Sequence, residues 1–231
     1  LILSALAPFT VISLSRTFMN ETKTSALINI IYITIIASLI TLLICKLFSK
    51  FPSFDIIDIS NYLGGNIFRI IVGFVFIFYF LITSAMLLRD FCEGLNIVYY
   101  PFTKIIYIIM LFIIATAISN NLGFNSTIKT TALIFPVIMI SIILLFIGNL
   151  NNFSFEKIFP LLGEGFHNTF VLGLINIGAF TGISYLYFLP PLLKDPSKFK
   201  MISILSTILS GLFIFICVAT LLFMFSIYVS T

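Results

Sequence analysis

The sequence predicts an all-α polytopic membrane protein: one transmembrane domain over residues 1–231, with about seven helices, two of them broken. The first observation is composition, because 61% of the 231 residues are hydrophobic and 9% are charged, whereas about a quarter of a soluble domain is charged. The second is that several apolar runs approach the roughly 20 residues needed to cross a bilayer. The third is that Pro, Gly, Thr and Ser interrupt two of these runs.

The first apolar run, residues 1–14, is shorter than a full crossing, and we interpret it as the end of a first helix. Because the chain begins and ends inside apolar runs, we expect it to be a fragment of a longer protein. Pro8, Phe9 and Thr10 interrupt this helix. They predict either a simple kink or an opening that exposes the main chain to a ligand.

The next two elements are a smooth helix over about 25–47 and a short amphipathic helix in the link that follows it, residues 51–65. The link places apolar and polar side chains on opposite faces, which is typical of a helix lying in the membrane interface. Its apolar face carries Ile56, Ile57, Ile59, Tyr62 and Leu63. Gly64 and Gly65 are expected to end this helix.

The third crossing is expected over about 66–91, and a short charged stretch is expected to follow it. Arg89 and Glu93 in this stretch are four residues apart, so they share one helix face. Two roles fit this pair: an ion pair at the membrane interface, or a gate or subunit contact.

Two further helices are expected over about 103–119 and 128–148, the second of them kinked at Pro136. A polar loop then contains Glu164, for which a solvated turn and a gate or subunit contact are the alternatives. The last crossing is expected over about 201–228 and, like the helix over 25–47, has no Pro interruption.

The sixth helix, over about 169–190, is the best candidate for a binding site. Small or hydroxylated residues lie near its middle: Gly178, Thr181, Gly182 and Ser184. Transporters place substrate sites at such interruptions, where an unwound helix frees backbone groups. The alternative is close packing against a neighbouring helix, which small residues also allow.

The sequence carries no pattern typical of an enzyme, a metal site or a cofactor site. It has no HExxH, no GxSxG and no phosphate-binding loop, and its three cysteines are scattered. We therefore expect no catalytic residue, no metal and no cofactor. The net charge of +4 gives no reason to expect a nucleic-acid partner, and the expected surrounding is the lipid bilayer.

The order of five short motifs resembles the spore germination permease family, the B subunits of GerA-type germinant receptors, within the amino acid/polyamine/organocation transporter superfamily. The five segments are ISLSR at 12–16, FPSFDIIDISNYLGG at 51–65, LRDFCE at 88–93, FPLLGEG at 159–165 and FLP at 188–190. The resemblance covers essentially the whole chain. It departs from the family at Pro8, Phe9 and Thr10, which replace a glycine-rich GxG, and at Ser184, which replaces a frequent acidic residue.

This resemblance implies a partial LeuT-like bundle that belongs to a longer ten-helix permease. Helices one and six would then be broken and would face each other across the substrate site. The residues implied on the two sides are Pro8, Phe9 and Thr10, and Gly178, Thr181, Gly182 and Ser184. Freed backbone groups and hydroxyls would meet a small amino acid there.

The resemblance also implies a function: a receptor subunit of the spore inner membrane that senses a small nutrient, such as an amino acid, and triggers germination with the receptor's A and C subunits. An active amino acid permease of the cell membrane is the alternative. The expected middles of the spans carry no acidic residue, which argues against proton coupling but leaves sodium coupling open. A third possibility is a membrane anchor or channel element that binds no ligand.

Overall fold

The computed structural model describes residues 23–121, 123–150, 153, 165–193 and 196–224. Over these ranges the chain forms six α-helices, several 3-10 helices and no strand, which confirms the predicted all-α class. Segments long and apolar enough to cross a membrane are Ala26–Phe48, Ile56–Val98, Gly165–Tyr187 and Phe199–Phe223. Four such segments indicate an integral membrane protein.

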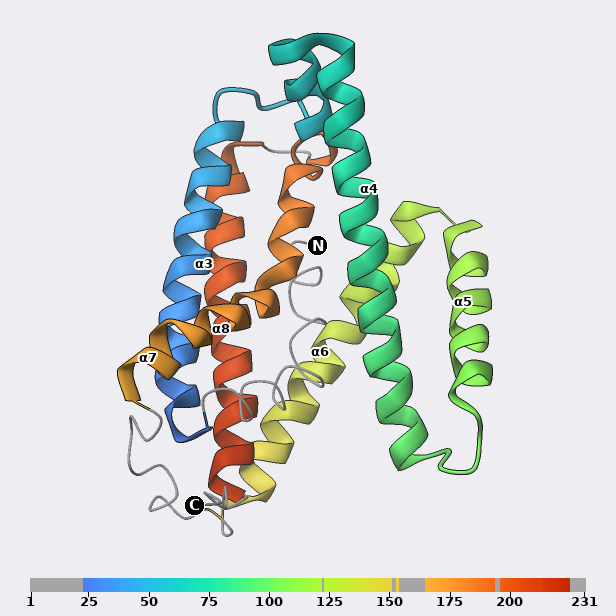
Figure 1. The fold of residues 1–231 in the computed structure, drawn as a ribbon, viewed down its shortest axis with the longest axis vertical. Helices are drawn as coiled ribbons and strands as arrows, with labels where there is room; N and C mark the ends of the chain where they lie inside the picture. The colour runs from blue at the N-terminus through green and yellow to red at the C-terminus, as the bar shows by residue number, and fades with distance from the viewer. Residues whose placement is uncertain (1–22, 122, 151–152, 154–164, 194–195, 225–231) are drawn as a thin grey trace.

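The centre of the fold is an antiparallel pair of helices, α3 (Ala26–Phe48) and α8 (Phe199–Met224), which lie side by side in Figure 1. The short 3-10 helix η2 (Lys23–Ser25) leads into α3. Both long helices agree with the expected crossings, and the part expected beyond Met224 lies outside the described residues. The hydrophobic core includes Ile30, Ile33, Ile44, Ile214, Val218 and Leu222 from this pair.

The seam between α3 and α8 is made of small and hydroxylated residues, and both helices are uninterrupted, as expected. The buried hydroxyls on α8 include those of Ser203, Ser206, Thr207 and Ser210. The Thr207 hydroxyl lies 3.1 Å from that of Thr41 on α3. A Cβ added at Gly211 would overlap the Thr34 side chain. Small residues therefore let the two backbones approach closely, as in other membrane helix pairs.

The amphipathic helix and the third crossing form one element, α4 (Ile56–Val98), which bends at Gly65. Gly65 has φ 69° and ψ −167°, a conformation that glycine adopts readily. Asp55 and Asp58 begin the helix with a capping box, in which the Asp58 N–H donates to Asp55 Oδ1 at 2.7 Å. In Figure 1 the first turns of α4 lie across one end of the bundle.

The third crossing is longer than expected, because α4 continues to Val98 rather than ending near 91. Arg89 and Glu93 consequently lie inside the helix and not in a loop after it. The Asn96 side-chain amide donates to the carbonyls of Tyr100 and Thr103, at 2.8 Å and 2.6 Å. These bonds satisfy carbonyls just beyond the helix and explain why it ends there.

The remaining α-helices of the described chain pack less closely. α5 (Ile105–Asn121) and α6 (Phe124–Gly148) each have few buried residues, and Pro136 lies inside α6 as expected. The expected sixth helix consists of α7 (Gly165–Phe170) and the 3-10 helix η5 (Leu172–Tyr187). Two short 3-10 turns, η6 (Pro190–Leu192) and η7 (Pro196–Lys198), lead into α8.

Candidate functional site

The candidate site is built on η5, which is 16 residues long. A 3-10 helix usually lasts three or four residues, because its hydrogen bonds are poorer than those of an α-helix. Phe180 leaves the helical region altogether, with φ −100° and ψ 24°. The irregular backbone therefore lies in the middle of an apolar segment that is long enough to cross the membrane.

Residues three apart lie above one another in a 3-10 helix, so η5 presents three rows of side chains. All the buried residues of η5 lie on two of these rows: Gly173, Asn176, Ala179 and Gly182 on one, and Phe180, Ile183 and Leu186 on the other. No member of the third row is buried; it contains Leu172, Ile175, Gly178, Thr181, Ser184 and Tyr187. The structure thus brings three of the four predicted small residues onto one row and puts Gly182 on another.

Gly178 has open space beside it. Within the described residues, a Cβ added at Gly178 would meet no atom within 4 Å. Close packing against a described helix therefore does not explain this glycine, which was one of the two alternatives for the small residues. Gly182, in contrast, is buried, as packing requires.

The main-chain carbonyl of Thr181 is the polar centre of the third row. It accepts a hydrogen bond from the Ser184 hydroxyl at 2.6 Å and a long one from the Tyr79 hydroxyl of α4 at 3.5 Å. The Ser184 hydroxyl is thus directed at its own backbone. A carbonyl beside the departure at Phe180 can accept N–H or O–H donors that a regular helix would exclude.

Aromatic rings hold this end of η5 against α4. The rings of Phe80 and Tyr185 stack with centroids 4.9 Å apart, and those of Phe76 and Phe188 meet edge to face at 5.0 Å. Offset-stacked and edge-to-face geometries are the favourable ones for aromatic pairs. α4 therefore fixes the position of the Thr181 row.

A second polar group lies at the junction of α7 and η5 and faces α3. We call it the amide cluster; it comprises Ser25, Asn29, Thr169 and Asn176, all buried. Asn29 Nδ2 donates to the Thr169 carbonyl at 2.7 Å, and Asn176 Nδ2 donates to Asn29 Oδ1 at 2.9 Å. The Thr169 hydroxyl donates to Ser25 Oγ at 2.9 Å. These bonds link the irregular segment to α3.

One atom of the amide cluster lacks a partner. Asn176 is 1% exposed, and its Oδ1 accepts no hydrogen bond within the part of the chain that the structure describes. A buried unsatisfied carbonyl costs free energy, and a donor in its vicinity would remove that cost. Asn176 shares its row with Gly182, two turns further along η5.

The other predicted site residues are not brought into this site. Arg89 and Glu93 form the expected ion pair on one helix face, Nε to Oε1 at 2.8 Å, with side chains 74% and 45% exposed. Arg89 is ten residues beyond Tyr79, which is about 15 Å along α4. Pro8, Phe9, Thr10 and Glu164 lie outside the described residues.

Neither Asn29 nor Asn176 is among the predicted site residues, although the sequence does carry a signal. An asparagine inside a membrane-spanning segment is costly unless it finds a partner. Both residues lie in the same tetrapeptide, Leu-Ile-Asn-Ile, at 27–30 and at 174–177. Two isolated amides in two apolar spans are typical of residues that bond to each other.

The chemistry available at the site is neutral. Among the described residues, no charged side chain is buried and no group of three His, Cys, Asp or Glu side chains could hold a metal ion. Amides, hydroxyls and main-chain carbonyls remain, and these groups recognise small polar molecules without shifting a proton.

Comparisons with known proteins extend these observations. Residues 1–231 match the family described as spore germination protein. Spore germination protein B2 of Bacillus subtilis (strain 168) is 21% identical over 203 residues, which cover 88% of this chain and 55% of that protein. The chain thus spans about half the length of the curated relative that it matches. No solved structure matches the chain.

Proposed function

Because this chain belongs to the spore germination protein family, we propose that it is a receptor subunit of the spore inner membrane that senses a small nutrient, such as an amino acid. Its family is a germination family and not a class of enzymes, which agrees with the lack of an enzyme signature in the sequence. Nutrient binding would trigger germination together with the receptor's A and C subunits.

The observation that carries the proposal is the irregular backbone of η5. The departure at Phe180 stands next to the Thr181 carbonyl, and Gly178 leaves open space on the same row. The ammonium group of a small amino acid would bond to such a carbonyl, and the Ser184 hydroxyl would turn from the main chain to the ligand. Pro8, Phe9 and Thr10 of the first helix, together with Gly182, would complete the site.

The proposed architecture is a partial LeuT-like bundle, a single transmembrane domain within a longer ten-helix permease, with about seven crossings in this chain. Helices one and six would be its broken helices. Support comes from the 3-10 conformation of η5 and from its position beside α3 and α8. The inner membrane of the spore is the location that the family suggests.

Ligand binding would be relayed through the amide cluster. Asn176 bonds to Asn29, and Asn29 bonds to the Thr169 carbonyl, so a shift of η5 would be felt by α3. A ligand changes such an equilibrium only by binding one arrangement more tightly than the other. The exposed Arg89–Glu93 pair, and Glu164, would then serve as a gate or as contacts with the A and C subunits.

The experiment is binding of a radiolabelled amino-acid panel to the full-length protein in its receptor complex. Gly178→Phe fills the open space on the Thr181 row and is expected to lower affinity at least tenfold. Ile175→Phe adds bulk to the same row one turn earlier and serves as the matched control, with near-normal affinity expected. Binding that survives in Gly178→Phe at wild-type strength would remove this row as the site.

An amino acid permease is the second candidate. Among the described residues no Asp, Glu, His, Lys or Arg side chain is buried, so a transporter built this way would couple to sodium rather than to protons. Uptake of the same labelled amino acids into proteoliposomes separates the candidates. Uptake driven by a sodium gradient would favour the permease, and binding without uptake would favour the receptor.

A further inference from the structure

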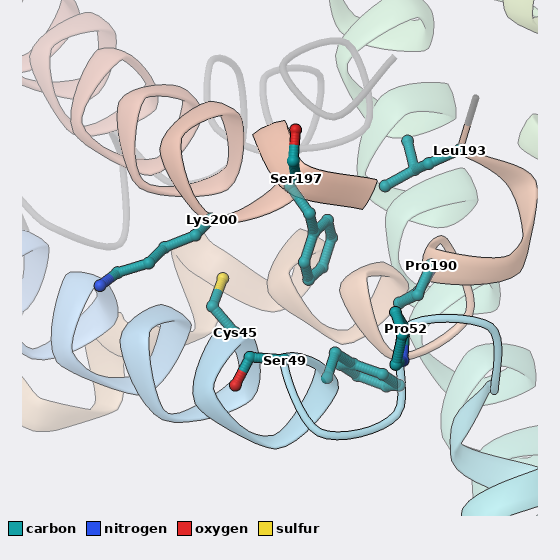
Figure 2. Close-up of a pocket in the computed structure, with 9 residues that line it drawn as sticks. Cys45, Ser49, Pro52, Pro190, Leu193, Ser197 and Lys200 are labelled. Atoms are coloured by element: carbon teal, nitrogen blue, oxygen red, sulfur yellow. The ribbon is translucent and has the colours of Figure 1, made fainter. Parts of the chain in front are cut away.

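A cavity of about 340 Å³ lies at one end of the bundle, beyond the end of the Thr181 row, where Tyr187 meets the cavity residue Phe48 edge to face. It is formed where α3 ends, where η6 turns and where α8 begins (Figure 2). The first turns of α4 lie across the same end of the bundle. The ends of two membrane spans meet at the cavity, and an interfacial helix lies at the same end of the bundle, which indicates the depth of the lipid headgroups.

The walls of the cavity are apolar and well packed. Phe48 of α3 and Phe199 of α8 are 2% and 6% exposed, and their rings meet edge to face with centroids 6.1 Å apart. Pro52, Pro190 and Leu193 close the other side. Two of these wall residues are prolines, whose fixed φ limits how far the chain can move into the space. The cavity is therefore a preformed feature of the fold.

The rim of the cavity is polar and basic. Ser49, Ser197 and Lys200 line it, and Figure 2 shows Lys200 extending from the start of α8 toward α3. Lys46 and Lys50 lie in and just after the last turn of α3, beside Ser49. Within the described residues, none of these three lysines forms an ion pair.

The nearest described carboxylates along the chain are those of Asp55 and Asp58, and both have another role. Each accepts a main-chain N–H in the capping box that begins α4. Among the described residues, neither carboxylate forms an ion pair with Lys46, Lys50 or Lys200, so these three lysines leave the described rim basic beside a cavity with apolar walls. Basic pockets between helices at the membrane surface bind lipid headgroups.

We propose that this cavity binds an anionic glycerophospholipid, with the headgroup phosphate at Lys200 on the polar rim and the glycerol region against Phe48 and Phe199. The positive charge of the lysines favours an anionic over a zwitterionic lipid, because the cationic group of a zwitterionic headgroup would be repelled by the lysines. The apolar walls and the membrane depth select a lipid over a soluble phosphate. This site shares no residue with the proposed nutrient site.

Bound lipid would connect the end of α3 to the start of α8. Both helices belong to the pair at the centre of the fold, and Ser49 and Lys200 come from opposite sides of the cavity mouth. A ligand that binds only this arrangement stabilises it in proportion to its concentration and affinity. The anionic lipid content of the membrane would thus tune the stability of the central pair.

The test is native mass spectrometry of the full-length protein taken from vesicles of equal parts phosphatidylglycerol and phosphatidylcholine. We expect the wild-type protein to retain phosphatidylglycerol preferentially, and Lys200→Gln to lower that preference about fivefold. Leu193→Trp, which fills the cavity but keeps every charge, is expected to lower it as well. Lys104→Gln, an exposed lysine in the α4–α5 loop, is the matched control and should change nothing.

Two results would overturn the proposal. One is equal retention of the two lipids by the wild-type protein, or an unchanged preference in both Lys200→Gln and Leu193→Trp. The other is loss of the bound phosphatidylglycerol on washing with inorganic phosphate but not with chloride at the same ionic strength, since the cavity would then take a soluble anion. Thermal unfolding of each variant in detergent checks that the fold is retained.

Discussion

α3 packs against α8 on one side and against η5 on another, and both contacts contain buried polar side chains. These side chains have different roles in the two contacts. On α8, the hydroxyls of Thr207 and Ser210 donate to carbonyls four residues back in their own helix. At η5, Asn176 bonds to another helix, through Asn29. Hydroxyls satisfied within their own helix allow close packing, whereas amides that bond across helices hold an irregular backbone in place.

This difference illustrates the two roles, close packing and ligand binding, that the sequence leaves open for small and polar residues in a span. The α3–α8 seam has regular helices and a glycine with no room for a side chain, Gly211. The η5 segment has a backbone departure at Phe180 and a glycine with open space, Gly178. The first arrangement is a packing interface, and the second is the kind of place where a ligand can meet the main chain.

The largest effect is expected from filling the seam. Gly211→Leu would overlap Thr34 and push α3 and α8 apart, at a cost of about 3 kcal/mol of unfolding free energy. Gly73→Leu on α4 is the matched control, because a Cβ there meets no described atom within 4 Å. Thermal unfolding in detergent measures both. Equal stability of the two variants would show that the seam is not tightly packed.

An intermediate effect is expected from the amide cluster. Asn29→Leu and Asn176→Leu should each destabilise the protein by about 1 kcal/mol, and the double variant by less than the sum, because both remove one shared bond. Asn149→Leu is the control, since among the described residues that side chain bonds to its own helix, at the Leu145 carbonyl. A double-mutant cycle on reversible unfolding measures the coupling. Simple additivity would contradict a direct interaction.

The smallest effect on stability is expected from two matched hydroxyl deletions. Ser210→Ala removes a bond to the Ser206 carbonyl, and Ser184→Ala removes one to the Thr181 carbonyl. Each should cost about 0.5 kcal/mol or less, because the bond is local. Only Ser184→Ala is expected to change nutrient affinity, severalfold. Nutrient binding and thermal unfolding measured on both variants test this. Equal nutrient affinity of the two variants would show that Ser184, like Ser210, contributes to packing and not to binding.

Much of the fold could be predicted because it depends on local properties. Long apolar runs predicted the spans, and the observed bounds of α3 lie within a residue or so of the expected ones. The pair Gly64-Gly65 predicted the end of the amphipathic helix, and the chain does bend at Gly65, where φ is positive. The end of α4 was placed too early, because the Asn96 side chain satisfies carbonyls beyond the expected end.

The candidate site was predicted less completely. The small residues of the sixth helix could be predicted from the sequence, but their distribution over the rows of the helix could not. That distribution depends on the 3-10 period, which puts Gly178, Thr181 and Ser184 on one row and Gly182 on another. The amide cluster was missed, because its members are up to about 150 residues apart in the chain and only the packing of η5 on α3 brings them together. The sequence around Asn29 does not indicate that it bonds to Asn176, and the sequence around Asn176 does not indicate that it bonds to Asn29.

The sequence by itself determined that this is a helical membrane protein of the spore germination family, since hydrophobic length and motif order are properties of the chain. Only the tertiary structure decided which faces of the helices are buried and which small residues pack. The physical reason is that lipid tails are as apolar as a neighbouring helix, so hydrophobic patterns do not mark the buried face of a span. Hydrogen bonds and close backbone contacts decide it instead, as at Asn29–Asn176 and at Thr34–Gly211.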